Sequence, residues 1–166
     1  MTKTASLTQA RLKEVLHYDP DTGVFTWAVG RKKAARNAVA GGFSDRGYFV
    51  IGVDGVRHRA HRLAWLYVHG EYPEQIDHEN HVRHDNRICN LRATTNTENH
   101  KNISKPVNNK SGVVGVSWTK RVRHQQGAWE VRACNKFLGY YDDFFEAVCK
   151  RKSVERQMNF HPNHGI

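Results

Sequence analysis

A polar stretch in the middle of the chain, residues 71–104, constrains the fold most. It is dense in His, Asn and Asp, and its aliphatic residues are Ile76, Val82, Ile88, Leu91 and Ile103. A stretch with so few apolar side chains cannot hold itself together by burial alone. It is therefore either a loop or a segment that a metal ion and side-chain hydrogen bonds organise.

The charge balance points to a polyanionic partner. Lys and Arg number 26 against 16 Asp and Glu, a formal net charge of +10, and the excess is concentrated after residue 100. A basic surface attracts nucleic acid first of all, although such charge can also serve solubility alone. No apolar run is long enough to span a bilayer, and the N-terminus lacks a signal-peptide core, so we expect a cytoplasmic protein with no membrane association.

The cysteines argue against two classes of small protein. Cys89, Cys134 and Cys149 are odd in number, lie far apart and form no Cys-x-x-Cys pair. A disulfide scaffold and a thiolate zinc finger are therefore poor interpretations. This cysteine usage is consistent with a reducing compartment.

Short periodic segments precede the polar stretch. The dipeptide Asp54-Gly55 is the strongest hairpin signal in the chain, and Gly70 is a typical helix end. The expected elements are a helix over 9–16 capped by Ser6 or Thr8, strands over 24–27, 48–53 and 56–60, and a helix over 61–69.

A second domain follows the polar stretch. We place a first domain at 1–104, a linker at 105–110 and a small domain at 111–166. Three strands are expected in the small domain, over 113–119, 128–133 and 137–141, and then a helix that Asp143 and Glu146 begin as a capping box. One helix covers only one face of such a sheet, so the other face is left free. The predicted fold class is α+β.

The polar stretch carries the candidate chemistry. A neutral imidazole such as His78 is a competent general base, and an adjacent carboxylate such as Asp77 can bind a cation. Thr95 and Glu98 have the spacing that begins a helix, and Asn99 in its first turn is an oxygen ligand that hard cations accept. The alternative is a structural zinc site made of His78, His81, His84 and His100, although no thiolate or further ligand is spaced to complete it.

The order of these residues resembles the HNH endonucleases, the ββα-metal or His-Me finger family, and among them the phage homing enzymes. The resemblance covers about residues 47–103. It rests on Asp77-His78, Asp85-Asn86-Arg87, Asn90-Leu91 and Asn99, together with the upstream His61-Arg62-Leu63-Ala64-Trp65. It places the HNH motif proper at about 61–103 and implies a ββα-metal core preceded by β-hairpins.

The resemblance also implies roles for individual residues. His78 would be the general base, and Asn90 would hold the motif loop closed and orient His78. Asp77 and Asn99 would bind one divalent cation, Mg²⁺ with Mn²⁺ as the alternative. Because the last motif position is Asn99 with His100 beside it, His100 is kept as an alternative ligand, and His81 and His84 as alternative ligands of metal or phosphate.

The last segment, about 110–160, resembles the AP2 DNA-binding domain, which lays a three-stranded sheet in the major groove. The resemblance rests on residues 110–118, Trp129-Glu130-Val131-Arg132, 137–141 and Glu146-Ala147. It implies DNA contacts through Ser117, Thr119, Glu130, Arg132, Asn135 and Phe137. Further candidate contacts in the chain are Trp118, Lys120, Arg121, Arg123 and Lys136, and Arg62, Arg87 and Arg92 in the nuclease region.

The sequence therefore predicts a phage-type, metal-dependent HNH endonuclease that acts on double-stranded DNA, directed to its site by an AP2-like domain. We expect a monomer that nicks, or a homodimer that cuts both strands. The alternative is a sequence-specific DNA-binding regulator that does not cut.

Overall fold

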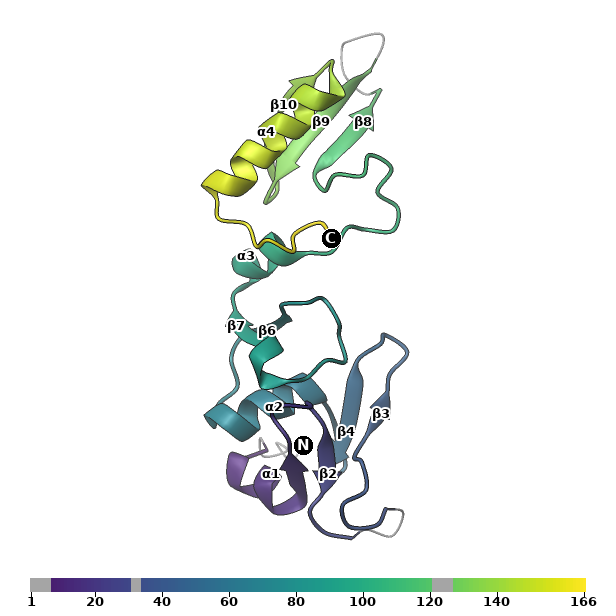
Figure 1. Cartoon of the computed structure of the whole chain (residues 1–166), viewed down its shortest axis with the longest axis vertical. Coiled ribbons are helices and arrows are strands. Elements are labelled where there is room, and N and C mark those ends of the chain that lie inside the picture. The colour runs from purple at the N-terminus through teal and green to yellow at the C-terminus, as the bar shows by residue number, and fades with distance from the viewer. Residues whose placement is uncertain (1–6, 31–33, 121–126) are drawn as a thin grey trace, which may run out of the picture. The chain divides into compact units, whose positions relative to one another are not determined.

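The structure, a computed structural model, describes residues 7–30, 34–120 and 127–166 (Figure 1). Its contacts divide the chain into two compact units, Met1–Thr94 and Thr95–Ile166. Segment 95–104, which we expected in the first domain, thus groups with the second unit. The C-terminal tail explains this grouping, because the backbone N–H groups of His161 and Gly165 donate to the carbonyls of Lys101 and Ile103 at 3.1 and 2.9 Å.

The first unit is built from two helices and three small antiparallel sheets. In sheet order the strands are β1-β2, β3-β4-β5 and β6-β7. The elements are α1 (Gln9–Val15), β1 (Leu16–Tyr18), β2 (Phe25–Trp27), β3 (Gly42–Phe43), β4 (Phe49–Val53), β5 (Val56–Arg59), α2 (Ala60–His69), β6 (Gln75–His78), the 3-10 turn η1 (Ile88–Asn90) and β7 (Leu91–Thr94).

Local signals place the expected elements of this unit. Thr8 caps α1, since its side chain accepts a hydrogen bond from the Arg11 N–H; Ser6 lies outside the described residues. Asp54 and Gly55 have φ values of 49° and 81°, as a two-residue hairpin turn requires, and Gly70 ends α2 with φ 80°. Strand β1 was not expected, because Leu16 has the spacing of a helix end and instead begins a strand.

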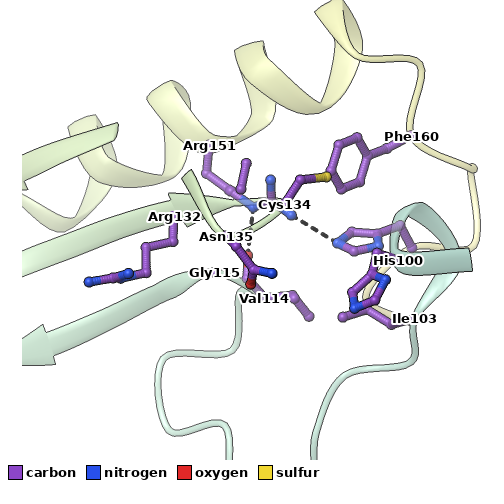
Figure 2. A pocket seen from close by; sticks show the side chains of 11 residues that line it. His100, Ile103, Val114, Gly115, Arg132, Cys134, Asn135, Arg151 and Phe160 are labelled. Atoms are coloured by element: carbon purple, nitrogen blue, oxygen red, sulfur yellow. Dashed lines mark hydrogen bonds between the residues drawn. The ribbon is translucent and has the colours of Figure 1, made fainter. Parts of the chain in front are cut away.

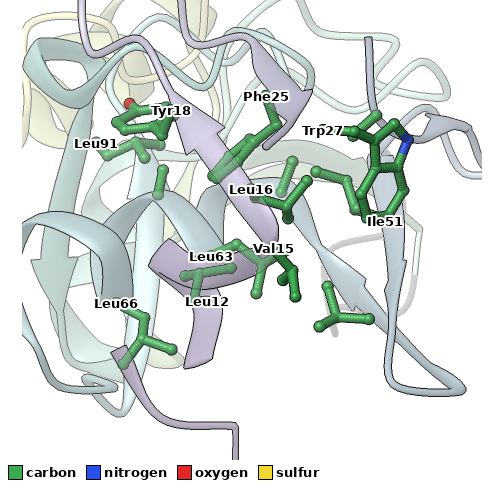
Figure 3. Close-up of a cluster of buried hydrophobic side chains, with 14 residues drawn as sticks. Leu12, Val15, Leu16, Tyr18, Phe25, Trp27, Ile51, Leu63, Leu66 and Leu91 are labelled. Atoms are coloured by element: carbon green, nitrogen blue, oxygen red, sulfur yellow. The ribbon is translucent and has the colours of Figure 1, made fainter. Parts of the chain in front are cut away.

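One hydrophobic core holds this unit together (Figure 3). Leu12, Phe25, Ile51 and Leu63 are at most 1% exposed within it. Leu91, the first residue of β7, joins the same cluster and so brings the polar stretch onto the core. Strands β6 and β7 and the turn η1 thus lie within the stretch, and apolar residues from elsewhere in the sequence contribute to its stability.

Polar contacts complete this anchoring. The Tyr18 hydroxyl donates to the Asn86 carbonyl at 2.7 Å, and the Ile88 N–H donates to the Pro20 carbonyl at 3.2 Å. Gly23 has φ +73°, and a Cβ there would lie 2.5 Å from the Arg87 nitrogen. The chain can pass so close to the polar stretch only with glycine at this position.

The second unit is a three-stranded antiparallel sheet with one long helix, as expected. Its elements are α3 (Asn96–Asn99), the 3-10 turn η2 (His100–Asn102), β8 (Val116–Thr119), β9 (Ala128–Ala133), β10 (Lys136–Tyr141) and α4 (Phe144–Gln157), with strand order β10-β9-β8. Asp143 caps α4 by accepting from the Glu146 N–H at 2.9 Å. Ala147 of α4 packs on Val116 and Val131 of the sheet, so α4 covers that face.

A buried arginine fastens the C-terminal tail to this unit (Figure 2). Arg151 of α4 is 2% exposed; its Nε donates to the Val114 carbonyl at 2.8 Å, and its Nη2 lies 2.9 Å from Nε2 of His164. Burial lowers the pKa of both groups, so His164 is neutral and accepts this hydrogen bond. The Arg151–His164 contact lines a cavity of about 170 Å³ that Phe160 and Cys134 also border.

No helix in the described part of the chain combines the length and the apolar character that crossing a membrane requires.

Candidate functional site

His78 is the last residue of β6 and lies in a buried aromatic setting. It is 6% exposed. Its ring centroid is 4.9 Å from that of His61, at an interplanar angle of 87°, and 6.5 Å from that of Tyr48. Burial lowers the pKa of His78, while the Asn86 side chain and the carboxylates of Asp77 and Asp85 act against this shift. The imidazole is therefore neutral near pH 7, the form that can accept a proton.

His61, in the first turn of α2, is a site residue that the sequence reasoning missed. Burial is the largest cause that lowers its pKa to about 3, followed by the neighbouring His78. Its Nδ1 is buried with no hydrogen-bond partner among the described residues. The resemblance marks His61 only as part of an upstream helix; the inward position of a histidine beside Leu63 and Ala64 was the available signal.

Asp77 stands beside His78 and forms an ion pair across the β6–β7 hairpin. Its register partner is Arg92, whose Nη2 and Nε donate to Oδ2 of Asp77 at 2.8 and 3.2 Å. The side chain of Asp77 is 11% exposed and that of Arg92 is 27% exposed. Arg92, expected as a DNA contact, is thus engaged with the carboxylate that we expected to bind metal.

Asn90 closes the loop between β6 and β7. Its Oδ1 accepts from the Asn80 N–H at 3.1 Å, its Nδ2 donates to the Asp85 carbonyl at 2.9 Å, and its carbonyl accepts from the Glu79 N–H at 3.0 Å. These bonds fit the loop-closing role that the resemblance implied. Neither of the side-chain bonds involves the ring of His78.

The same loop contains a second ion pair. Arg87 donates to both carboxylate oxygens of Asp85, at 2.8 and 2.6 Å. This contact is the largest cause that lowers the pKa of Asp85 to about 2; the hydrogen bond from Asn80 acts in the same direction, and burial acts against both. Arg87 remains 46% exposed in its side chain, so it can still meet a phosphate.

The other histidines of the polar stretch are dispersed. His81 adopts a left-handed backbone with φ 62°, and the ring of His84 packs 5.5 Å from that of Phe43. Within the described residues, no group of three or more His, Cys, Asp or Glu side chains could hold a metal ion. The zinc alternative therefore gains no support.

Asn99 and His100 belong to the second unit. Thr95 caps α3 by accepting from the Glu98 N–H at 3.3 Å, and Asn99 is the last residue of this short helix. The Nδ1 of His100 lies 2.6 Å from the Asn96 carbonyl, to which it donates. This bond occupies one ring nitrogen of His100.

The donor chemistry of Asp77 and Asn99 suits a hard divalent cation. A carboxylate and a carboxamide both offer oxygen, and Mg²⁺ binds through few protein oxygens while it keeps several waters. Asp77 is the third residue of β6 in the first unit, and Asn99 is the last residue of α3 in the second unit. Each residue therefore has, by itself, the donor chemistry that the implied cation accepts.

In the second unit the candidate DNA contacts gather on one sheet face. Ser117 pairs with Glu130, and Arg132 pairs with Phe137, in the antiparallel register. Since side chains alternate along a strand, these four and Thr119 lie opposite the face that Val116 and Val131 bury under α4. Arg132 also forms an ion pair with Glu130, which raises its pKa.

The remaining candidates of this unit are placed differently. Trp118 is 47% exposed, but it lies on the α4 side of the sheet, with its ring 5.2 Å from that of Trp129. Asn135 and Lys136 lie at the β9–β10 turn, where Asn135 has φ 64°. Lys120 follows β8, whereas Arg121 and Arg123 lie outside the described residues.

The first unit also has a basic groove, of which the sequence analysis predicted only Arg62 as a DNA contact. It has a volume of about 430 Å³ and lies where β5 leads into α2. Arg62, a predicted contact, donates to the Pro73 carbonyl at 3.2 Å and lies over the ring of Tyr72. The residues that line the groove are Leu7, Arg57, His58, Arg59, Arg62 and Tyr72.

Comparison with known proteins gives one match. The family model described as HNH endonuclease matches residues 58–101, a segment that runs from β5 through η2 and contains the Asp77–His78 pair and the Asn90 loop. No curated protein and no solved structure matches the chain. The match supports the HNH part of the resemblance over residues 58–101, and an HNH domain suggests a nuclease that acts on DNA.

Proposed function

We propose that this protein is a metal-dependent HNH endonuclease that hydrolyses phosphodiester bonds in double-stranded DNA. One observation carries the proposal: the HNH match falls on a buried, neutral His78 directly beside Asp77. A histidine kept neutral at physiological pH can take a proton from water, and the adjacent carboxylate supplies a cation ligand.

His78 acts as the general base through a particular nitrogen. Its Nε2 is buried. Nδ1 is therefore the nitrogen that receives the proton of the attacking water. Tyr48 and His61 pack around the ring and restrict its rotation, while Asn90 keeps the loop that follows it closed.

Asp77 would supply a carboxylate ligand to a divalent cation, Mg²⁺ with Mn²⁺ as the alternative, and Asn99 would be the second ligand that the resemblance implies. Such a cation, when bound, neutralises charge on the scissile phosphate and on the leaving oxygen. Arg92, paired with Asp77 in the free protein, is close enough to the site to contact a phosphate of the bound DNA.

The second unit selects the DNA site. Its sheet has three strands, the number that the AP2 resemblance implies, and the face away from α4 displays Ser117, Arg132 and Phe137. A two-stranded or wider β-surface fits the major groove. With one HNH domain per chain, the monomer nicks DNA and a homodimer cuts both strands, as expected of a phage homing or mobile-element enzyme.

A plasmid assay tests this function. The purified protein is incubated with supercoiled plasmid, or with its native genomic DNA, in Mg²⁺ or in EDTA, beside a His78→Ala variant. Conversion to open-circle or linear DNA with Mg²⁺ and the unmutated protein alone is the expected result. Binding to DNA with no strand loss in Mg²⁺ or Mn²⁺ would instead favour the regulator that does not cut.

A further inference from the structure

We propose that Asn86 is the positioning residue of His78: its side-chain oxygen accepts the Nε2–H of the neutral imidazole and thereby fixes the tautomer that leaves Nδ1 unprotonated. The tautomer is a property of the free protein. Its catalytic meaning rests on the nuclease function proposed above.

The two atoms are complementary and both are buried. Asn86 is 4% exposed and His78 is 6% exposed. Nε2 of His78 and Oδ1 of Asn86 each lack a well-formed hydrogen-bond partner within the described part of the chain. A buried donor or a buried acceptor that is left unpaired destabilises the folded protein. One bond between them pairs both atoms.

Contacts on the rest of Asn86 hold its amide in a single orientation. Its Nδ2 donates to the His84 carbonyl at 3.0 Å, and its backbone carbonyl accepts from the Tyr18 hydroxyl at 2.7 Å. With the amide nitrogen engaged there, the oxygen is the atom left for His78. In agreement, the Asn86 side chain acts on His78 as a hydrogen-bond partner that raises its pKa against the effect of burial.

The resemblance gave the orienting role to Asn90. The side chain of Asn90, however, bonds to groups other than His78. Both ends of its amide are bonded to the loop, to Asn80 and to Asp85. Loop closure and imidazole orientation are therefore divided between two asparagines, Asn90 and Asn86. The ring of His61 packs against His78 at 87°, which limits its rotation but sets no tautomer.

The test is ¹⁵N NMR of the histidine side chains in the metal-free protein at a pH where His78 is neutral, assigned with His78→Gln. The two ring nitrogens have different shifts when one carries the proton, so the spectrum reports the tautomer without any catalysis. The expected spectrum shows His78 protonated at Nε2. A spectrum with the proton at Nδ1, or with a mixture of both forms, would overturn the proposal.

Two substitutions at Asn86 isolate the acceptor. Asn86→Leu has similar size but no oxygen, so we expect a mixture of tautomers; Asn86→Asp keeps the oxygen, so Nε2–H is retained. Asn80→Ala is the control, because it removes loop hydrogen bonds to Asp85 and Val82 without touching His78. If Asn86→Leu, shown to be folded by its backbone amide spectrum, left the tautomer unchanged, the role assigned to Asn86 would be wrong.

Kinetics connects the tautomer to catalysis. Outer-shell partners of catalytic and metal-binding histidines contribute about 10- to 100-fold. We expect Asn86→Leu to lower kcat by a factor in this range with little change in KM, and Asn86→Asp to restore part of the loss. If no DNA is cleaved under any condition, the nuclease function fails while the NMR result still decides the tautomer.

Discussion

His61 and His78 face each other as two perpendicular imidazoles, 4.9 Å apart, in the interior of the first unit. His61 comes from α2 and His78 from β6, so the helix that precedes the polar stretch supplies one wall of the site. Both rings have lowered pKa values, with burial as the first cause. Protonation of either neutral imidazole in this interior is therefore disfavoured.

This pair makes the stability of the first unit sensitive to acid. The pKa of His61 falls from 6.5 in the unfolded chain to about 3. Between these two pH values the His61 imidazole is protonated in the unfolded chain and neutral in the folded protein. The free energy of unfolding therefore decreases as pH falls from about 6.5 toward 3. The slope from His61 is about 1.4 kcal/mol per pH unit. Denaturant unfolding at several pH values measures it, and His61→Phe should flatten the curve; an equally steep curve in that variant would contradict the assignment.

Gly23 tests how the polar stretch is anchored. A Cβ at this position would lie 2.5 Å from the Arg87 nitrogen and 2.6 Å from the Asn86 carbonyl carbon, at φ +73°. Gly55 has a similar φ of +81°, but a Cβ there would meet nothing within 4 Å. We expect Gly23→Ala to cost about 3 kcal/mol or more, from backbone strain plus a clash. Gly55→Ala should cost about 1 kcal/mol from strain alone. Equal costs in chemical denaturation would show that the close approach is absent.

A substitution at Arg151 tests how the C-terminal tail is attached to the rest of the second unit. The Arg151 guanidinium is 2% exposed, against His164 and 3.3 Å from the buried Glu155 carboxylate. Arg151→Met removes a buried ion-pair partner of Glu155, leaving it only the more exposed Lys152, and also removes the bonds to Val114 and His164, so it should destabilise the second unit by about 3–5 kcal/mol. Lys152→Met is the matched control, because Lys152 also pairs with Glu155 but its side chain is 48% exposed. Hydrogen exchange of the β9 amides should rise in the first variant and stay nearly unchanged in the second.

Arg132 tests the uncovered sheet face as the DNA surface. It lies on this face beside Phe137, whereas Lys150 is exposed on α4, the helix that covers the other face. An arginine that reads a base or binds a phosphate is worth about 1–3 kcal/mol. Arg132→Ala should thus weaken binding about tenfold, measured on a fragment that the unmutated protein selects from random sequences. Lys150→Ala should have little effect, and the reverse ranking would assign DNA binding to α4.

Much of the fold could be predicted because its signals are local. The turn at Asp54-Gly55, the caps at Thr8 and Asp143, and the helix end at Gly70 all depend on residues close in sequence. The strands and the helix of the second unit were placed for the same reason. The HNH spacing likewise marked Asp77 and His78 as candidates, because the motif lies within one short segment of the chain, and the family model covers both residues.

The features that could not be predicted depend on contacts between residues that lie far apart in the sequence. Leu91 anchors the polar stretch in a core built from α1, α2 and the early strands. The residues next to Leu91 in the sequence give no signal of this contact. Trp118 lies with Trp129 because of the strand register, which the composition of the strand does not set. The contact of His61 with His78 joins two elements whose packing depends on the whole core of the first unit.

The most direct test of the account separates binding from cleavage at His78. DNA affinity, measured in EDTA or Ca²⁺, and cleavage rate in Mg²⁺ are compared for the unmutated protein and His78→Ala. A general base contributes to the transition state and not to phosphate binding, so cleavage should fall by about 10²–10⁴ while affinity changes less than about twofold. Cleavage that survives in His78→Ala, or an equal loss of affinity and cleavage, would contradict the assignment of His78 as the base.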